Sequence, residues 1–155
     1  MARSEISNIL EKCELFRGLN RNEVQKIATL GRPETYKAGE NILNQGDFGE
    51  NLYIIAEGMV VLERSIDLGT RRGNVVIGLL GRGRALGCWS TLLGEPHTLM
   101  SSAKCRKPTK AVVIRGLDLR EMMMGNLPLG FKVLERLCFI LRDRIHSAFG
   151  AMENV

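Results

Sequence analysis

Several features that define common protein classes are missing from this 155-residue sequence, or nearly so. It has no uninterrupted apolar run of about 18 residues, which a membrane-spanning helix requires. Its first ten residues, MARSEISNIL, are too polar for a secretory signal peptide. Aromatic residues make up only 5% of the chain, so a stacking surface for single-stranded nucleic acid is not indicated. These absences predict a cytoplasmic protein that does not span a membrane.

Cysteine and histidine are scarce, and their spacing argues against a metal centre. No two of the four cysteines form the Cys-x-x-Cys pair that zinc and thioredoxin-like sites use. The two histidines, His97 and His146, lie far apart in the sequence. No nucleophile–base pair and no paired carboxylates occur at a useful spacing. The sequence therefore predicts neither a metal site nor an enzyme.

Acidic residues are almost absent from one stretch of the chain. Between Arg71 and Lys110 there are eight basic residues and one acid, Glu95. The stretch therefore carries a net charge of +7, although the whole chain carries only +5. Two interpretations remain open: a solvated basic face, or a field that attracts an anion.

The N-terminal 31 residues have helical spacing, and the stretch after them has the short apolar runs of strands. Asn20 followed by Glu23 matches an N-cap with its capping-box partner. From residue 32 to residue 116 the apolar runs alternate with glycine-containing turns, and Glu57-Gly58 has the character of a hairpin turn. Strands at this spacing, without helices between them, predict a mainly β fold of the barrel or roll type.

Residues 117–150 return to helical spacing, and Pro128 suits the first turn of a long final helix. A heptad-like apolar stripe follows this helix, made of Phe131, Leu134, Cys138, Leu141, Ile145 and Ala148. We expect the roll to cover the first turns, at Phe131 and Leu134, and a second copy of the chain to cover the rest. The predicted homodimer interface comprises Phe131, Leu134, Cys138, Leu141 and Ile145. The alternative is a monomer whose helix folds back on the roll.

Three stretches of the sequence resemble the cyclic-nucleotide-binding domain family, the sensor module of catabolite-activator transcription factors, cyclic-nucleotide-dependent kinases and gated channels. LFRGLNRNEVQKIA resembles the family's N-terminal helical segment. YKAGENILNQGDFGENLYIIAEGMVVL resembles its signature, and GCWSTLLGEPHTLMSSAKC occupies the place of its phosphate-binding cassette. The resemblance runs from about Leu10 to Phe149. It implies a jelly-roll-type β-roll with N-terminal helices and a long C-terminal helix.

The expected organisation is one domain spanning residues 1–155. Its parts are helices in 1–31, the β-roll in 32–116 with the cassette-like segment 87–103, and helices in 117–150. The family's transcription factors carry a helix-turn-helix domain beyond this point. Since none is present in the sequence, we expect no reader of DNA sequence.

The cassette departs from the family pattern at two positions. The family begins its cassette with Gly-Glu, whose acid accepts a hydrogen bond from the ribose 2′-hydroxyl; Gly87 matches, but Cys88 replaces the acid. His97 stands where the family has an arginine that binds the cyclic phosphate. A histidine offers fewer donors than an arginine and is mostly uncharged at pH 7. The two losses weaken binding by about 2.5–4 kcal/mol, which is on the order of 100- to 1000-fold.

Other groups near the cassette still favour an anion. The predicted short helix from Trp89 to Leu93 directs its positive end towards a ligand, and Arg82 and Arg84 lie just upstream. We therefore expect a small anionic ligand, either a cyclic nucleotide or another anion. The expected ligand-binding residues are Gly87, Cys88, Trp89, Ser90, His97, Thr98, Arg82 and Arg84.

The leading hypothesis is a small-ligand-sensing regulatory domain, with weak or altered nucleotide binding, that signals to a protein partner through its C-terminal helix. A first alternative is a ligand-independent module that dimerises or docks to a protein. A second alternative, implied by sensors among the family's relatives, is a redox or haem sensor that uses Cys88 or His97.

Overall fold

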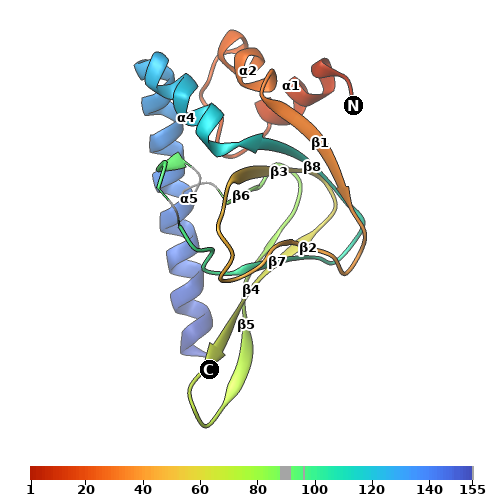
Figure 1. Cartoon of the computed structure of the whole chain (residues 1–155), viewed down its shortest axis with the longest axis vertical. Coiled ribbons are helices and arrows are strands. Elements are labelled where there is room, and N and C mark those ends of the chain that lie inside the picture. Colours follow the sequence, from red (N-terminus) through yellow and green to blue (C-terminus); the bar gives the residue numbers. More distant parts are fainter. Residues whose placement is uncertain (88–91, 96, 155) are drawn as a thin grey trace.

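The computed structural model describes residues 1–87, 92–95 and 97–154 (Figure 1). A β-roll lies at the centre, with helices at one end and along one side. The helices are α1 (Arg3–Glu11), α2 (Arg21–Ala28), α4 (Gly116–Gly125) and α5 (Leu127–Glu153). The strands are β1 (Gly31–Tyr36), β2 (Asn41–Leu43), β3 (Asn51–Glu57), β4 (Val60–Asp67), β5 (Arg72–Leu80), β6 (Ala85–Leu86), β7 (Ser102–Cys105) and β8 (Thr109–Arg115). Within the described ranges, no helix is long and apolar enough to cross a lipid bilayer.

The described strands form two antiparallel sheets, with the orders β1-β8-β3-β6 and β2-β7-β4-β5. The chain passes repeatedly between the sheets, so strands distant in sequence pair with each other. β1 pairs with β8, for example, with Gly31 opposite Ile114. β4 and β5 form a long hairpin that projects beyond the roll (Figure 1). The predicted mainly β roll with flanking helices is confirmed.

The turn between β3 and β4 requires a glycine. Gly58 has a φ of +107°, which residues with a side chain rarely adopt. A Cβ atom at Gly58 would also lie 2.8 Å from the carbonyl oxygen of Pro108, which is backbone and cannot move aside. Two strands do meet at Glu57-Gly58, since β3 ends at Glu57 and β4 begins at Val60, but the predicted hairpin is wrong: β3 and β4 belong to different sheets and pair with other strands.

Two apolar clusters hold the molecule together. The larger cluster packs the helices against the sheet that contains β3 and β8, and the smaller one fills the roll. The capping box predicted at the start of α2 is confirmed. The N–H of Glu23 donates to Asn20 Oδ1 at 2.9 Å, and the N–H of Asn20 donates to Glu23 Oε1 at 3.1 Å. This cap satisfies two backbone donors that the first turn of the helix would otherwise leave unpaired.

The helix α5 buries a different row of residues from the predicted stripe. Its buried residues are Leu129, Gly130, Val133, Leu137 and Ile140. Phe131 and Leu134 are 68% and 44% exposed, so the expectation that the roll covers them is wrong. The buried row lies one residue before the predicted stripe, about 100° around the helix. Both rows are apolar at the same 3-4 spacing, and contact with the core selects the buried one.

Candidate functional site

A cavity of about 500 Å³ lies between the roll and the C-terminal half of α5. The roll contributes Leu43, Leu62, Arg64, Ile77 and Leu86 to its wall. The segment that follows β6 contributes Gly87, His97, Thr98, Leu99, Met100 and Ser101. The helix α5 contributes Leu141, Arg144, Ile145, Ala148 and Met152. The volume is typical of small-molecule sites, which occupy about 300–1,000 Å³, and the lining is mostly apolar.

Gly87 is fixed at the cavity wall by the short strand β6. This strand pairs with β3, with Leu86 opposite Tyr53. Gly87 has a φ of +72°, and a Cβ atom there would lie 2.6 Å from the carbonyl oxygen of Asn51. The turn into the cassette-like segment therefore requires the glycine.

The structure brings three of the eight predicted ligand residues to the cavity: Gly87, His97 and Thr98. Cys88, Trp89 and Ser90 lie outside the described residues, as does part of the predicted short helix. His97 is half-buried, and its carbonyl accepts a hydrogen bond from the N–H of Gly49. Thr98 forms an isolated β-bridge with Phe48, and this bridge holds the end of the cassette-like segment next to the roll.

Arg82 and Arg84 are not among the residues that line the cavity. Arg82 is exposed. The Nε atom of Arg84 lies 2.9 Å from Oε2 of Glu14, in the segment between α1 and α2. The structure therefore directs the charge of Arg84 towards Glu14.

Two arginines line the cavity that the sequence analysis did not assign to it. Arg64 of β4 donates to the carbonyl oxygen of Met100. Arg144 of α5 donates to the carbonyl oxygen of Ala85, and its Nη2 atom lies 3.3 Å from Oε1 of Glu14. Since the described lining includes no acidic residue, the cavity wall carries positive charge.

The helical spacing contained a signal for Arg144. It follows Leu141 by three residues and precedes Ala148 by four, so the three side chains share one face of α5. In the sequence alone, that face predicted only a dimer interface. The positive charge of Arg144 between these apolar residues was the signal that the same face could also contact a ligand.

The predicted dimer residues share one side of α5 but divide along its length. Leu141 and Ile145 line the cavity, although Ile145 is still 51% exposed. Phe131, Leu134 and Cys138 are exposed away from the core. The stripe therefore does not form one uniform surface.

The buried Cys105 thiol has no reactive environment. Burial raises the pKa of the Cys105 thiol, and a hydrogen bond with Thr109 partly offsets that effect. A raised pKa keeps the thiol protonated and poorly nucleophilic. No cluster of three or more potential metal ligands occurs in the part of the chain that the structure describes.

A β-roll with a long C-terminal helix, and a cavity between the two, is the architecture that this chain shares with solved regulatory sensor domains. The family model described as "Cyclic nucleotide-binding domain" matches residues 33–126, which is more than half of the chain. This protein therefore belongs to the cyclic nucleotide-binding domain family, a family of regulatory sensor domains.

Solved structures and curated proteins show the same likeness. A cyclic nucleotide-binding domain from Methylobacillus flagellatus KT superposes with a TM-score of 0.80 at 25% identity, covering 99% of this chain and 84% of that one. The catabolite activator protein of Thermus thermophilus gives a TM-score of 0.70 at 30% identity, covering 90% and 62%. The cGMP-dependent protein kinase egl-4 of Caenorhabditis briggsae is 33% identical over 64 residues, which are 41% of this chain and 8% of the kinase. The likeness to the kinase thus concerns a small part of its length.

Proposed function

We propose that this protein is a small-ligand-sensing regulatory domain, active in the cytoplasm, whose ligand binds between the roll and α5. One observation carries the proposal: a single cavity has walls from the roll, from the segment after Gly87 and from about three turns of α5. A ligand in this cavity contacts both the roll and the helix. Its binding free energy therefore differs between positions of α5, which is the requirement for a ligand to shift that helix.

Ordinary cyclic nucleotides bind this pocket weakly in our proposal, because Cys88 and His97 replace the two groups that the family uses. We expect cyclic AMP and cyclic GMP to bind in the millimolar range. The only tryptophan, Trp89, lies in the cassette-like segment, so its fluorescence reports occupancy. Titration with either nucleotide, checked by calorimetry, tests the expectation. Saturation at low micromolar concentration would contradict it.

A rescue experiment tests the assignment of the site directly. The double variant Cys88→Glu with His97→Arg should bind cyclic AMP on the order of 100- to 1000-fold more tightly than the native chain. The matched control is Thr70→Glu with His146→Arg, which introduces the same two side chains at exposed positions that do not line the cavity. A folded rescue variant with no more affinity than the control would refute the assignment of the site.

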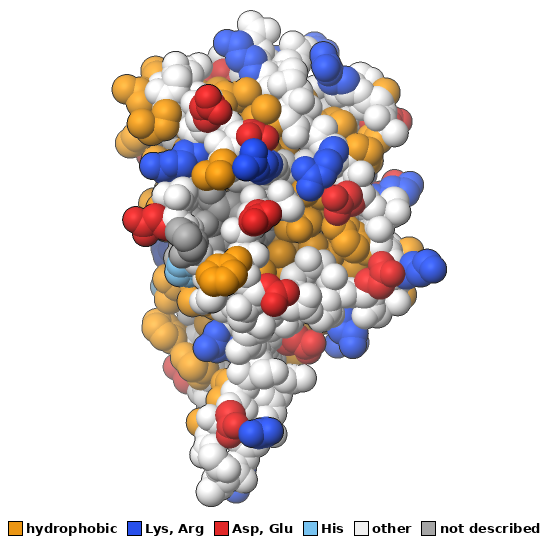
Figure 2. Space-filling model, viewed as in Figure 1, with side chains coloured by type: hydrophobic (Ala, Val, Ile, Leu, Met, Phe, Trp, Pro, Cys, Tyr) orange, Lys and Arg blue, Asp and Glu red, His pale blue; other side chains and the backbone are white. Residues whose placement is uncertain are grey.

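A second proposed function, homodimerisation through α5, is supported by the apolar residues that the helix leaves exposed. Phe131, Leu134 and Phe149 are 68%, 44% and 59% exposed. Figure 2 shows apolar side chains gathered where α4 and the start of α5 lie. A second copy of the chain, packed along this helix, would bury them.

Sedimentation equilibrium tests the dimer. We expect a dimer for the native chain at tens of micromolar, and a monomer for Phe131→Asp with Leu134→Asp. Phe48→Asp with Leu68→Asp, which are exposed on the roll and its β4–β5 hairpin, is the matched control. A native monomer would rule out this interface.

A further inference from the structure

We propose that the ligand of the cavity is an anion with an elongated apolar body, and that its charged group binds Arg144 in exchange for Glu14. The inference rests on the proposed function, because it assumes that the cavity holds a ligand. It adds the chemical class of that ligand and the residue that recognises its charge.

The carboxylate of Glu14 is shared by two arginines. Arg84 Nε lies 2.9 Å from Oε2, and Arg144 Nη2 lies 3.3 Å from Oε1. One carboxylate neutralises one guanidinium, so the cluster keeps a net positive charge. The side chains of Glu14 and Arg144 are only 15% and 20% exposed, so water screens this charge less than it would at the surface. An anion in the adjoining cavity would neutralise it.

One donor of Arg144 lacks a partner in the described part of the chain, and it can reach an anion when the side chain turns towards the cavity. Its side chain lines the cavity, and its Nε atom is buried without a hydrogen-bond acceptor among the described residues. It donates to the carbonyl oxygen of Ala85, two residues before Gly87. The charged group of the ligand therefore binds beside the start of the cassette-like segment.

The exchange leaves Glu14 with other partners. The N–H of Ala85 donates to its Oε1 at 2.9 Å, and Arg84 remains beside its Oε2. The Nε of Arg84 makes no hydrogen bond to any described residue, so the Arg84–Glu14 pair can gain one when Arg144 turns away. Because the carboxylate is not left unpaired, the exchange avoids the main cost of breaking a partly buried ion pair.

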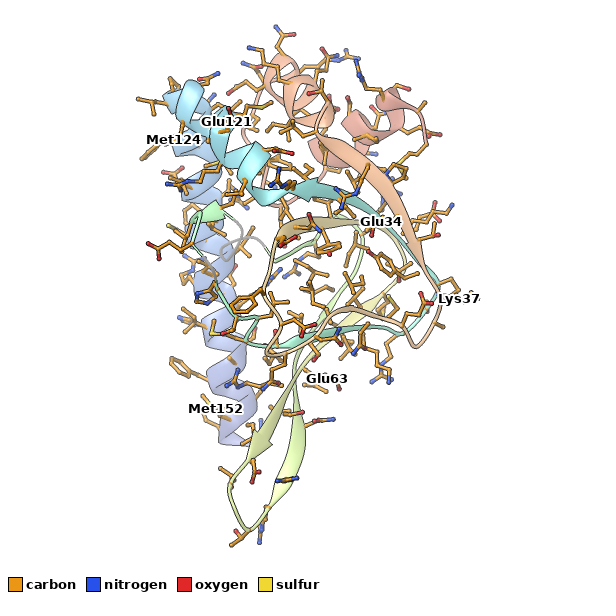
Figure 3. The ribbon with its side chains drawn as sticks, in the orientation of Figure 1. Glu34, Lys37, Glu63, Glu121, Met124 and Met152 are labelled. Atoms are coloured by element: carbon orange, nitrogen blue, oxygen red, sulfur yellow. The ribbon has the colours of Figure 1, made fainter. Side chains whose placement is uncertain are left out.

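The shape of the cavity determines the rest of the ligand. It follows α5 from Leu141 to Met152, a distance of about 16 Å at 1.5 Å per residue. Met152 lies near the C-terminal end of the helix (Figure 3). Between Arg144 and Met152 the wall includes Ile145 and, from β5, Ile77. A ligand with its charge at Arg144 would therefore extend an apolar body along the helix.

Calorimetry with the full chain tests the ligand class, using decanoate, decyl phosphate and neutral decanol below their aggregation limits. We expect both anions to bind at least about tenfold more tightly than decanol. Arg144→Gln should remove this preference, and Arg142→Gln should keep it, because Arg142 is exposed and paired with Asp143. The ratio of the two anions distinguishes a carboxylate ligand from a phosphate ligand.

A second variant separates recognition from structural support. Glu14→Gln removes the competing charge, so it should raise the affinity for decanoate, whereas a merely structural role predicts no gain. Arg144→Lys retains the charge and should keep part of the preference for the anions over decanol. This variant tests the role of Arg144 if Arg144→Gln fails to fold.

Failure of this inference is distinguishable from failure of the proposed function. Equal binding of decanol and decanoate, or an unchanged preference in Arg144→Gln, overturns the anion assignment and leaves a ligand pocket in place. Absence of binding by these three compounds and by cyclic nucleotides, also in the Cys88→Glu with His97→Arg variant, overturns both.

Discussion

The two halves of α5 have the same helical geometry but different surroundings. Residues 127–140 include all five buried residues of the helix, and Lys132 of this half lies 3.0 Å from Glu23 of α2. Residues 141–153 include no buried residue; they lie beside β5 and over the cavity. One continuous helix therefore has two roles: its first half packs into the core, and its second half forms part of the cavity wall. Core packing fixes the first half, whereas the second half contributes Leu141, Arg144 and Ile145 to the wall of the cavity.

Truncation of one leucine or isoleucine in each half should give the largest contrast. Leu137→Ala removes a side chain that is 4% exposed, and should lower the free energy of unfolding by about 2–5 kcal/mol. Ile145→Ala removes one that is 51% exposed, and should cost less than about 1 kcal/mol. Urea denaturation measures both values. Equal losses would show that the second half is packed as tightly as the first.

Two glycines of α5 should respond to alanine with opposite signs. A Cβ atom at Gly130 would lie 2.9 Å from the carbonyl oxygen of Met123, so Gly130→Ala should destabilise the protein by about 1–2 kcal/mol. A Cβ atom at Gly150 meets no described atom within 4 Å. Gly150→Ala should therefore stabilise the helix by about 0.5 kcal/mol. Thermal unfolding measures both variants, and two effects of the same sign would remove this distinction between the halves.

The ion pair that anchors the first half should give the smallest contrast between a variant and its control, and one that depends on pH. The backbone N–H of Asn20 lowers the pKa of Glu23, and Lys132 adds to this against the opposing effect of burial. A lowered pKa means that the ionised carboxylate stabilises the fold at neutral pH. This stabilisation is lost as the pH falls below 4.5, the ordinary value, through the lowered pKa.

Glu23→Gln should therefore cost about 1 kcal/mol at pH 7, and its difference from the native chain should shrink below pH 4.5. Denaturation at a series of pH values measures the difference. The control is Glu121→Gln, which removes the same charge from the exposed surface of α4 (Figure 3). A difference that stays constant from pH 7 to about pH 3 would contradict the assignment.

The features that the sequence predicted well are encoded by neighbouring residues. The turn at Gly58 and the cap at Asn20 each depend on residues within a few positions, so turn and capping chemistry identified them. The long signature stretch then placed these elements in a β-roll.

The features that the sequence did not predict depend on distant residues. Arg144 and Glu14 are separated by 130 positions, so no local pattern connects them. For the same reason Arg84 was expected to face a ligand, although its partner is Glu14. The buried face of α5 was predicted wrongly for another reason. Leu137 and Ile140, which are buried, directly precede Cys138 and Leu141 of the predicted stripe, and both rows have the same 3-4 spacing.

Because α5 forms a wall of the cavity, our proposal implies that a partner that holds this helix also acts on the pocket. Thermodynamic linkage makes the effect symmetric: a ligand that changes the affinity of α5 for a partner by some factor has its own affinity changed by the same factor. With a second copy of the chain as that partner, the ligand concentration at half-saturation depends on the protein concentration. The sensitivity of the sensor is then set in part by how much of the protein a cell makes.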